Sequence, residues 1–182
     1  MEERDGRFLL SHKDKKDDDL IAFIYYKYVN ELFIWGKTFT SETELIRDSI
    51  QDLFIYFLDN KGKLDSIQNL RVYLFCSLRH NIIRNLNNKP GYDTNSFLEN
   101  SEPTIEDGLI NEEITHSQKK FLKEAFRSLS KRQKRVIFLR YKLQMEYDEI
   151  CKVLDINYQS ARTLVYRAIN KMKETYQIIK IL

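Results

Sequence analysis

Apolar positions recur at helical spacing over most of the chain. Between residues 18 and 86, and again from residue 117 onward, they fall three or four apart, which predicts amphipathic helices. The chain has only 5 glycines and 2 prolines, too few for the many tight turns of a β-sandwich or barrel. A length of 182 residues allows one domain or two small ones. We therefore predict an all-α protein with two small helical domains.

The two helical stretches are separated by a segment without a sustained period. This segment, residues 87–116, holds both prolines and carries 7 acidic residues against 1 basic residue. Breaker residues between periodic segments are typical of a linker. We expect a domain at 18–86, an acidic flexible linker at 87–116 and a domain at 117–182, with residues 1–17 as an N-terminal tail.

Charge is divided unequally along the chain. The net charge is +3, but residues 1–86 carry −1, residues 87–116 carry −6 and residues 117–182 carry +10. A part this basic is typical of a protein surface that binds a polyanion through phosphate contacts. A solvated basic surface without a ligand is the alternative on charge alone.

The second expected helix presents an acidic face. It follows a first helix from Asp18 to Gly36 and begins at the capping-box pattern Ser41–Glu44. Its core stripe is Ile46, Ile50, Leu53, Phe54 and Phe57. The opposite side carries Glu44, Leu45, Asp48, Asp52 and Ile55, with Gln51 at its edge. Carboxylates mixed with aliphatic side chains indicate a protein-docking surface, and an ordinary charged face is the equal alternative.

The third expected helix, residues 70–86, combines chemically different groups on its outer side. Leu74, Phe75, Leu78, Ile82 and Leu86 face inward at helical spacing. The other side carries Tyr73, Ser77, His80, Asn81 and Arg84. An aromatic ring, hydrogen-bonding amide and imidazole groups and a cation together can stack on and hold unpaired bases.

The basic domain is expected to begin with two helices. The first starts near Ser117, and the second starts at the capping box Ser130–Gln133. In the second helix we expect Val136, Ile137, Leu139 and Tyr141 to pack. We expect its cations to face outward, namely Lys131, Arg132, Lys134, Arg135 and Arg140.

A helix-turn-helix follows. We expect a short helix over residues 147–154 and a long helix over 158–175, joined by Asp155, Ile156 and Asn157. Two helices with so short a connection form this motif. Asn157 suits the N-cap of the long helix. Asp155 falls where the turn needs a left-handed backbone, which Asp tolerates less well than Gly.

The outward side of the long helix carries groups that contact nucleic acid. These residues are Tyr158, Gln159, Arg162, Thr163, Tyr166 and Arg167. Such donors and acceptors read base edges in a major groove, and the cations bind phosphates. A basic amphipathic helix inside a bundle is the alternative, and the short turn and outward polar residues disfavour it.

Enzymatic and metal-binding motifs are missing from the sequence. The three histidines, His12, His80 and His116, are widely separated, and no HExxH, Gly-rich phosphate loop or nucleophile elbow occurs. Cys76 and Cys151 form no CxxC pair, so a zinc site or disulfide framework is not expected. We expect no catalytic residue, metal or cofactor. The charged N-terminus and the lack of a long apolar run predict a cytoplasmic protein without membrane insertion.

In their order and spacing, these motifs resemble the RNA polymerase sigma factors of the compact two-domain extracytoplasmic-function class. RDSIQDLFIYFL is similar to the helix that docks on the polymerase clamp coiled coil, and YLFCSLRHNIIRNL to the helix that melts the promoter and reads the −10 element. Residues 127–173 are similar to the domain that reads the −35 element. The YLF-x-SLR phrase most resembles the sub-group found in Bacteroidetes.

The resemblance implies a role for each group of residues. Asp48, Gln51 and Asp52 would contact core polymerase. The melted −10 strand would be held by the loop 61–69 together with Tyr73, Ser77, His80, Asn81 and Arg84. The −35 duplex would be read and clamped by Gln159, Arg162, Thr163, Tyr166 and Arg167. The implied partners are core RNA polymerase (clamp coiled coil and flap), promoter DNA and an anti-sigma factor, and the implied protein is not an enzyme.

Several positions depart from the pattern of the family. Tyr73 stands where many members have Trp, and His80 where many have Asn. Glu146 replaces a Ser or Thr helix cap. Gln144 and Asp155 replace common glycines, and Cys151 replaces a common alanine.

Two other functions fit parts of the same pattern. A helix-turn-helix regulator would bind duplex DNA tightly without polymerase, with the first domain sensing a ligand or partner. A helical adaptor would bind proteins only. Tight binding to an operator duplex by the protein alone would distinguish the regulator from a sigma factor.

Overall fold

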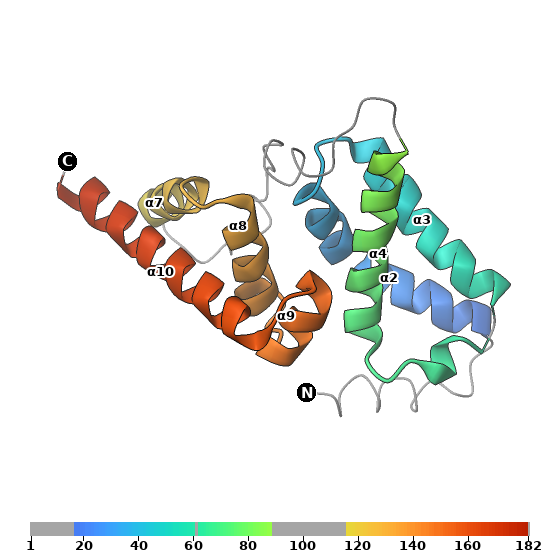
Figure 1. Cartoon of the computed structure of the whole chain (residues 1–182). Coiled ribbons are helices and arrows are strands. Elements are labelled where there is room, and N and C mark those ends of the chain that lie inside the picture. Colours follow the sequence, from blue (N-terminus) through green and yellow to red (C-terminus); the bar gives the residue numbers. More distant parts are fainter. Residues whose placement is uncertain (1–16, 61, 89–115, 182) are drawn as a thin grey trace. The chain divides into compact units, whose positions relative to one another are not determined.

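The computed structural model describes residues 17–60, 62–88 and 116–181, and these residues form helices and no strand (Figure 1). The predicted all-α fold is therefore confirmed for this part of the chain. The chain divides into two compact units, residues 1–101 and residues 102–182.

Two of the expected segments have no structural description. The expected N-terminal tail, residues 1–17, and the expected linker, residues 87–116, lie almost entirely outside the described residues. The boundaries assigned to them from the sequence therefore stay predictions.

The first unit is built from three long helices that contact one another pairwise. Helix α2 spans Asp17–Lys37, α3 spans Thr43–Asp59 and α4 spans Leu70–Asn87, with the short 3-10 helix η1 at Leu64–Ser66 before α4. The inward stripes expected on α3 and α4 are buried without exception. Burial of these apolar faces against each other is what holds the three helices together.

The core of the first unit is centred on Trp35 of α2. The Trp35 side chain is fully buried. Its ring centroid lies 4.9 Å from that of Phe39 and 6.1 Å from that of Phe75. Its Nε1–H donates a hydrogen bond to the backbone oxygen of Phe75 in α4 at 3.2 Å. A buried Trp needs a partner for this donor, and here the partner fixes α2 against α4.

Helix α3 begins differently from the sequence prediction. Its N-cap is Glu42 and not Ser41, and no side chain caps the helix. The Thr40 hydroxyl instead accepts a hydrogen bond from the Glu42 N–H at 3.1 Å. The expected capping box at Ser41–Glu44 is therefore wrong. Helix α4 does have a side-chain cap, because Asn69 Oδ1 accepts from the Val72 N–H at 3.0 Å.

Gly36 lies inside α2, at a close approach to the other two helices. A Cβ atom at this position would overlap the Cγ2 methyl of Ile46 and lie 3.3 Å from Cδ1 of Ile82. We expect Gly36→Ala to destabilise the unit by about 1–3 kcal/mol through overpacking, although Ala favours helix by about 1 kcal/mol. Urea unfolding measures the change.

Gly62 is the control for this steric effect, because no atom lies within 4 Å of a Cβ placed there. Its φ of +86° makes any substitution cost backbone energy, but among side chains that are unbranched at Cβ the cost should not grow with length. Methionine should therefore cost more than alanine at position 36 and about the same as alanine at position 62. Equal costs for the two residues at position 36 would contradict a steric origin.

The second unit places one long helix against three shorter ones. Helix α7 spans His116–Arg127, α8 spans Lys131–Ile137, the π-helix η2 spans Phe138–Lys142, α9 spans Tyr147–Leu154 and α10 spans Tyr158–Ile181. Helix α10 contacts α7, α8 and α9. The predicted capping box of α8 is confirmed: Ser130 Oγ accepts from the Gln133 N–H, and Gln133 Oε1 accepts from the Ser130 N–H at 2.9 Å.

The inward and outward assignments for the α8 segment are partly wrong. Lys134 and Arg135 are 9% and 5% exposed, whereas Tyr141 is 56% exposed. Helix α8 packs between neighbours, and the Lys134 ammonium lies 5.7 Å from the centroid of the Phe126 ring in α7. The π-helix η2 then widens the turn, which rotates the residues after Phe138 relative to an α-helical register. Tyr141 therefore leaves the core side.

Candidate functional site

The helix-turn-helix is formed by α9 and α10, as the sequence predicts. Asp155 has φ 57° and ψ 55°, a left-handed conformation that turns the chain after α9. Asn157 Oδ1 accepts a hydrogen bond from the Ser160 N–H at 2.8 Å, which caps α10. Helix α10 extends to Ile181 and so continues past the expected end at Thr175.

Two departures from the family pattern fall at positive φ. Gln144 has φ 52° and Asp155 has φ 57°. Both stand at positions where the family that the sequence resembles commonly has Gly. Glycine adopts this conformation at the least cost in energy. At a third departure, Glu146 is the N-cap residue of α9, and the Glu149 side chain accepts from the Glu146 N–H at 2.8 Å. The turns at Gln144 and Asp155 and the start of α9 are thus formed without the side chains that are common in that family.

The residues expected to read the −35 duplex share the outward side of α10. They are Gln159, Arg162, Thr163, Tyr166 and Arg167. All are exposed except Thr163, which is half-buried, and Tyr166 is 67% exposed. Ala161 and Ala168, on the opposite side of the helix, are fully buried. One side of α10 therefore packs into the unit while the other offers polar groups to solvent.

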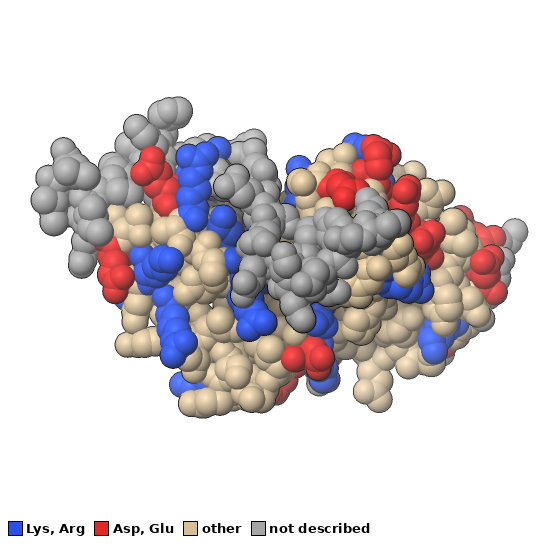
Figure 2. Space-filling view, turned by 45° about the horizontal axis from the view of Figure 1, so that its top comes forward, with Lys and Arg blue, Asp and Glu red and all other residues tan. Residues whose placement is uncertain are grey.

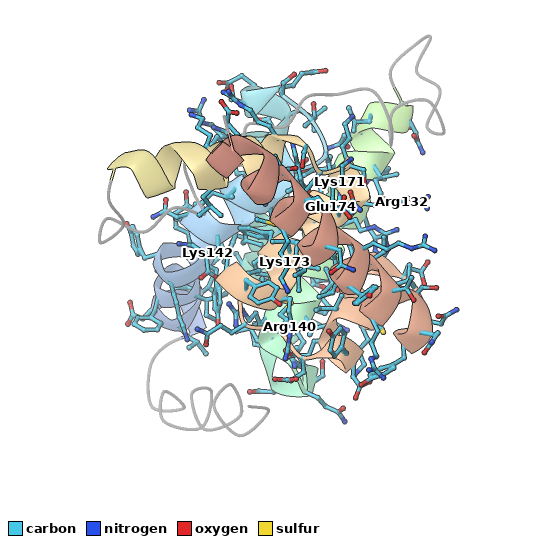
Figure 3. All side chains as sticks on the ribbon, turned by 90° about the vertical axis from the view of Figure 1, so that its left-hand side faces the viewer. Arg132, Arg140, Lys142, Lys171, Lys173 and Glu174 are labelled. Carbon is cyan, nitrogen blue, oxygen red and sulfur yellow. The ribbon has the colours of Figure 1, made fainter. Side chains whose placement is uncertain are left out.

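Further cations lie on the second unit. Lys and Arg side chains occur at several places over its surface in Figure 2. Figure 3 labels Arg132 of α8, Arg140 and Lys142 of η2, and Lys171 and Lys173 of α10. The cations of α8 are close enough to affect one another: burial, with the charges of Arg135 and Lys134, lowers the pKa of Lys131 to about 8. Such density of positive charge favours contact with a polyanion.

The residues expected to hold the melted −10 strand lie along one stripe of α4. Of the five, His80 and Arg84 are exposed, and Tyr73, Ser77 and Asn81 are half-buried. The Tyr73 ring packs against Phe57 of α3, with 5.7 Å between centroids. A supported aromatic ring that keeps part of its surface open is a suitable stacking platform.

Asn81 is partly engaged within the fold. Its Nδ2 donates to the backbone oxygen of Ser49 in α3 at 3.5 Å, and the neighbouring Asn85 Nδ2 donates to Ser49 Oγ at 3.2 Å. This contact uses one N–H of the Asn81 amide and involves neither the second N–H nor the side-chain oxygen. Sequence periodicity alone placed Asn81 outward and did not reveal this contact.

The residues expected to contact polymerase lie together on α3. Asp48, Gln51 and Asp52 are exposed. Ile55, one turn further, is 43% exposed and continues this face with an apolar group. Leu45 was expected on the same side but is buried, because the start of α3 packs into the unit.

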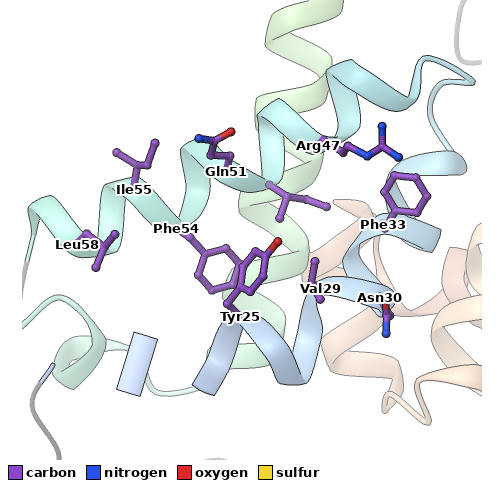
Figure 4. A pocket seen from close by; sticks show the side chains of 10 residues that line it. Tyr25, Val29, Asn30, Phe33, Arg47, Gln51, Phe54, Ile55 and Leu58 are labelled. Atoms are coloured by element: carbon purple, nitrogen blue, oxygen red, sulfur yellow. The ribbon is translucent and has the colours of Figure 1, made fainter. Parts of the chain in front are cut away.

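A groove of about 710 Å³ runs between α2 and α3 beside this face (Figure 4). Figure 4 shows the Tyr25 and Phe54 rings side by side, and their centroids are 5.1 Å apart. Gln51 and Ile55 of the acidic face also line the groove. The full lining is Tyr25, Val29, Asn30, Phe33, Arg47, Ile50, Gln51, Phe54, Ile55 and Leu58.

Sequence reasoning missed the groove, although α2 gave a signal. Tyr25, Val29 and Phe33 recur every four residues on a side of α2 that the core does not need. An apolar row outside the core stripe is typical of a surface that binds another molecule. The groove and the exposed residues of α3 therefore form one continuous candidate docking surface, apolar on one side and acidic on the other.

The described residues contain no candidate metal site. Among them, no group of three or more His, Cys, Asp or Glu side chains is placed to hold a metal ion. Burial and the charge of Asp148 raise the pKa of the Cys151 thiol, which disfavours its reactive thiolate form. No helix in this part of the chain is long and apolar enough to span a membrane.

Two comparisons with known proteins found similarities to this chain. Residues 122–172 match the family described as Sigma-70, region 4. The chain is similar in structure to the sigma factor RpoE from Bartonella quintana, solved in complex with the anti-sigma factor NepR. The TM-score is 0.54 at 17% identity, over 86% of this chain and 96% of that one. No curated protein matches the chain significantly in sequence. Residues 122–172 are thus similar in sequence to Sigma-70 region 4, and the chain is similar in fold to the sigma factor RpoE.

Proposed function

We propose that this chain binds core RNA polymerase and directs promoter-specific initiation by reading −35 duplex and melted −10 DNA. The observation that carries the proposal is the polar outer side of α10, which lies within the Sigma-70 region 4 match and is set by a capped short turn. A sigma factor works where the polymerase is, so the proposal includes action in the cytoplasm.

The second unit reads the −35 element as duplex. Arg162 lies on the exposed side of α10, about one turn from the cap at Asn157, where a recognition helix contacts base edges. Arg167 and the exposed cations Arg132 of α8 and Lys142 of η2 bind phosphates, which position the helix without specifying sequence.

The first unit captures the −10 element as a single strand. Tyr73 stacks a base, His80 and the Asn81 oxygen hydrogen-bond it, and Arg84 binds the backbone. Stacking is worth about 1–3 kcal/mol per base, which offsets the cost of unpairing. Because Tyr73 and His80 differ from the common family residues, the −10 preference is expected to differ as well.

The docking surface of the first unit binds core polymerase. Its carboxylates, Asp48 and Asp52, attract a basic partner, while Ile55 and the groove give apolar area to bury. Binding to the polymerase holds the two DNA readers on one particle, so the second reader acts at a raised effective concentration once the first has bound. We also propose that an anti-sigma factor regulates the chain, as NepR binds the similar RpoE.

In vitro transcription with core polymerase on genomic fragments tests the proposed function. The expected result is initiation from a small set of fragments that share two separated elements, with weak binding of the protein alone to the same duplexes. Failure to direct polymerase to any fragment, together with tight binding to a duplex without polymerase, would instead establish the regulator.

The double variant Gln51→Ala, Asp52→Ala tests the docking surface. We expect about a tenfold loss of affinity for core polymerase, since the variant removes a charge and an amide from the rim of the groove. Fluorescence titration of labelled protein with core polymerase measures it. The matched control is Asp65→Ala, Gln68→Ala, which removes the same groups from exposed positions near η1. Equal affinities of the two double variants would move the docking surface elsewhere.

A further inference from the structure

A stack of side chains joins the helices of the helix-turn-helix at their N-terminal ends. Tyr147 is the first residue of α9, and Tyr158 is the first residue of α10. Their ring centroids are 5.5 Å apart with an interplanar angle of 60°. The guanidinium carbon of Arg140 lies 5.0 Å from the centroid of the Tyr147 ring. The segments η2, α9 and α10 are therefore in contact through three side chains.

Arg140 is itself held at a defined place. Its Nη1 donates to the backbone oxygen of Met145 at 2.7 Å and to Glu146 Oε2 at 3.0 Å. Glu146 is the N-cap residue of α9, so both bonds attach Arg140 to the turn directly before that helix. A guanidinium is planar and stacks on aromatic faces, which a lysine ammonium does not do in the same way. The Tyr147 ring thus rests on a cation that the turn anchors.

From this geometry we infer that Arg140 and Tyr147 are positioning residues for the DNA-reading side chains of α10. The inference rests on the proposed function. Tyr158 at the start of α10 is supported by Tyr147, and Gln159 and Arg162 follow within the next turn or so. Hydrogen bonds to base edges need accurate placement of the helix end, whereas phosphate contacts tolerate small shifts. Loss of the stack should therefore reduce sequence discrimination more than overall affinity.

The Tyr147→Leu variant removes the ring and keeps an apolar side chain. An aromatic pair contributes modestly, so we expect about a three- to tenfold lower preference for the correct −35 sequence. Tyr147→Phe keeps the stack and should retain the preference. The matched control is Tyr141→Leu, because Tyr141 is a tyrosine of the same unit that is 56% exposed and lies outside the stack.

The experiment uses the full chain with core polymerase. The probe is a promoter selected by the holoenzyme from a pool randomised at the −35 element, compared with the same promoter whose −35 element is shuffled. The readout is the ratio of initiation from the two templates, together with the salt dependence of binding and the melting temperature of each variant. Two results together would support the positioning role. The ratio should fall for Tyr147→Leu while the salt dependence of binding is unchanged. The ratio should be retained for Tyr147→Phe and for Tyr141→Leu.

An unchanged ratio for Tyr147→Leu would overturn the inference, as would equal losses on both templates. If Tyr147→Leu does not fold, the same ratio is measured for Arg140→Lys instead. Lysine keeps the positive charge of residue 140 but lacks the planar guanidinium that stacks on the Tyr147 ring. A retained ratio for that variant would then overturn the inference. If the wild-type protein itself shows no preference between the templates, the −35-reading function is wrong, which is a separate result from a failure of the variants.

Discussion

Replacing Trp35 by alanine is expected to destabilise the first unit by about 3–5 kcal/mol, the range for removing a large buried aromatic side chain. Trp35 is fully buried and packs edge-on against Phe39. Its neighbours include Phe39, in the turn after α2, and Phe75 of α4, so a cavity here would weaken the packing of α2 against α4. The lost hydrogen bond to Phe75 adds to the loss of packing.

A loss of this size would remove a large part of the stability of the first unit, because domains are stable by only about 5–15 kcal/mol. We therefore expect the binding of Trp35→Ala to core polymerase to fall with the fraction of the unit that remains folded. Helical circular dichroism during urea unfolding gives the measurement, since the variant lacks the single tryptophan of the chain and with it the fluorescence signal.

Tyr26→Ala is the matched control for Trp35→Ala. Tyr26 is also an aromatic residue of α2, but it is 77% exposed. Its removal should change stability by no more than about 0.5 kcal/mol, as for most surface substitutions. If the two variants lost similar stability, the core of the unit would have to be centred elsewhere.

The parts of the fold that local rules govern were predictable from the sequence. The bounds of α9 agree with the prediction, and Asn157 and Asp155 have the cap and turn conformations expected of them. These outcomes depend on residues close together in the chain, namely a short polar side chain next to a backbone N–H and a residue that tolerates a left-handed turn. No distant contact had to be known.

Among the predictions about single residues that were wrong are the cap of α3, the exposure of Tyr141 and the exposure of Lys134. Each depends on contacts or on helix geometry that hydrophobic periodicity does not describe. At the start of α3 the sequence predicts a capping box from Ser41, whereas the N-cap is Glu42, whose N–H donates to the Thr40 hydroxyl. In η2 the π-helical turn moved Tyr141 outward, which a constant 100° per residue does not anticipate. The buried Lys134 depends on the ring of Phe126 in another helix.

The candidate sites were predictable in part for the same reason. A stripe on one helix, such as that of α4, follows from periodicity alone. The groove between α2 and α3 does not, because its lining combines residues of two helices whose packing the sequence does not state. The contact of Asn81 with α3 is likewise a tertiary effect, and it occupies one N–H of the side-chain amide.

The Arg162→Ala variant is expected to lose −35 discrimination while it keeps polymerase binding. Arg162 is exposed on the reading side of α10, and the helix around it is held by the Asn157 cap and the burial of Ala161. A well-placed contact from Arg to a base is worth about 1–3 kcal/mol of discrimination, and its loss relaxes specificity at one position of the site. The proposed polymerase contacts lie in the other unit, so they are unaffected.

Holoenzyme transcription from templates with intact and shuffled −35 elements measures the discrimination, and titration with core polymerase measures the binding. Lys171→Ala is the matched control, because Lys171 is an exposed cation further along α10. Its removal should weaken initiation on both templates to the same small extent, as expected for a contact that does not depend on sequence. A parallel loss of polymerase binding and discrimination in Arg162→Ala would contradict the role of Arg162, because a base contact cannot act on a polymerase site in a separate unit.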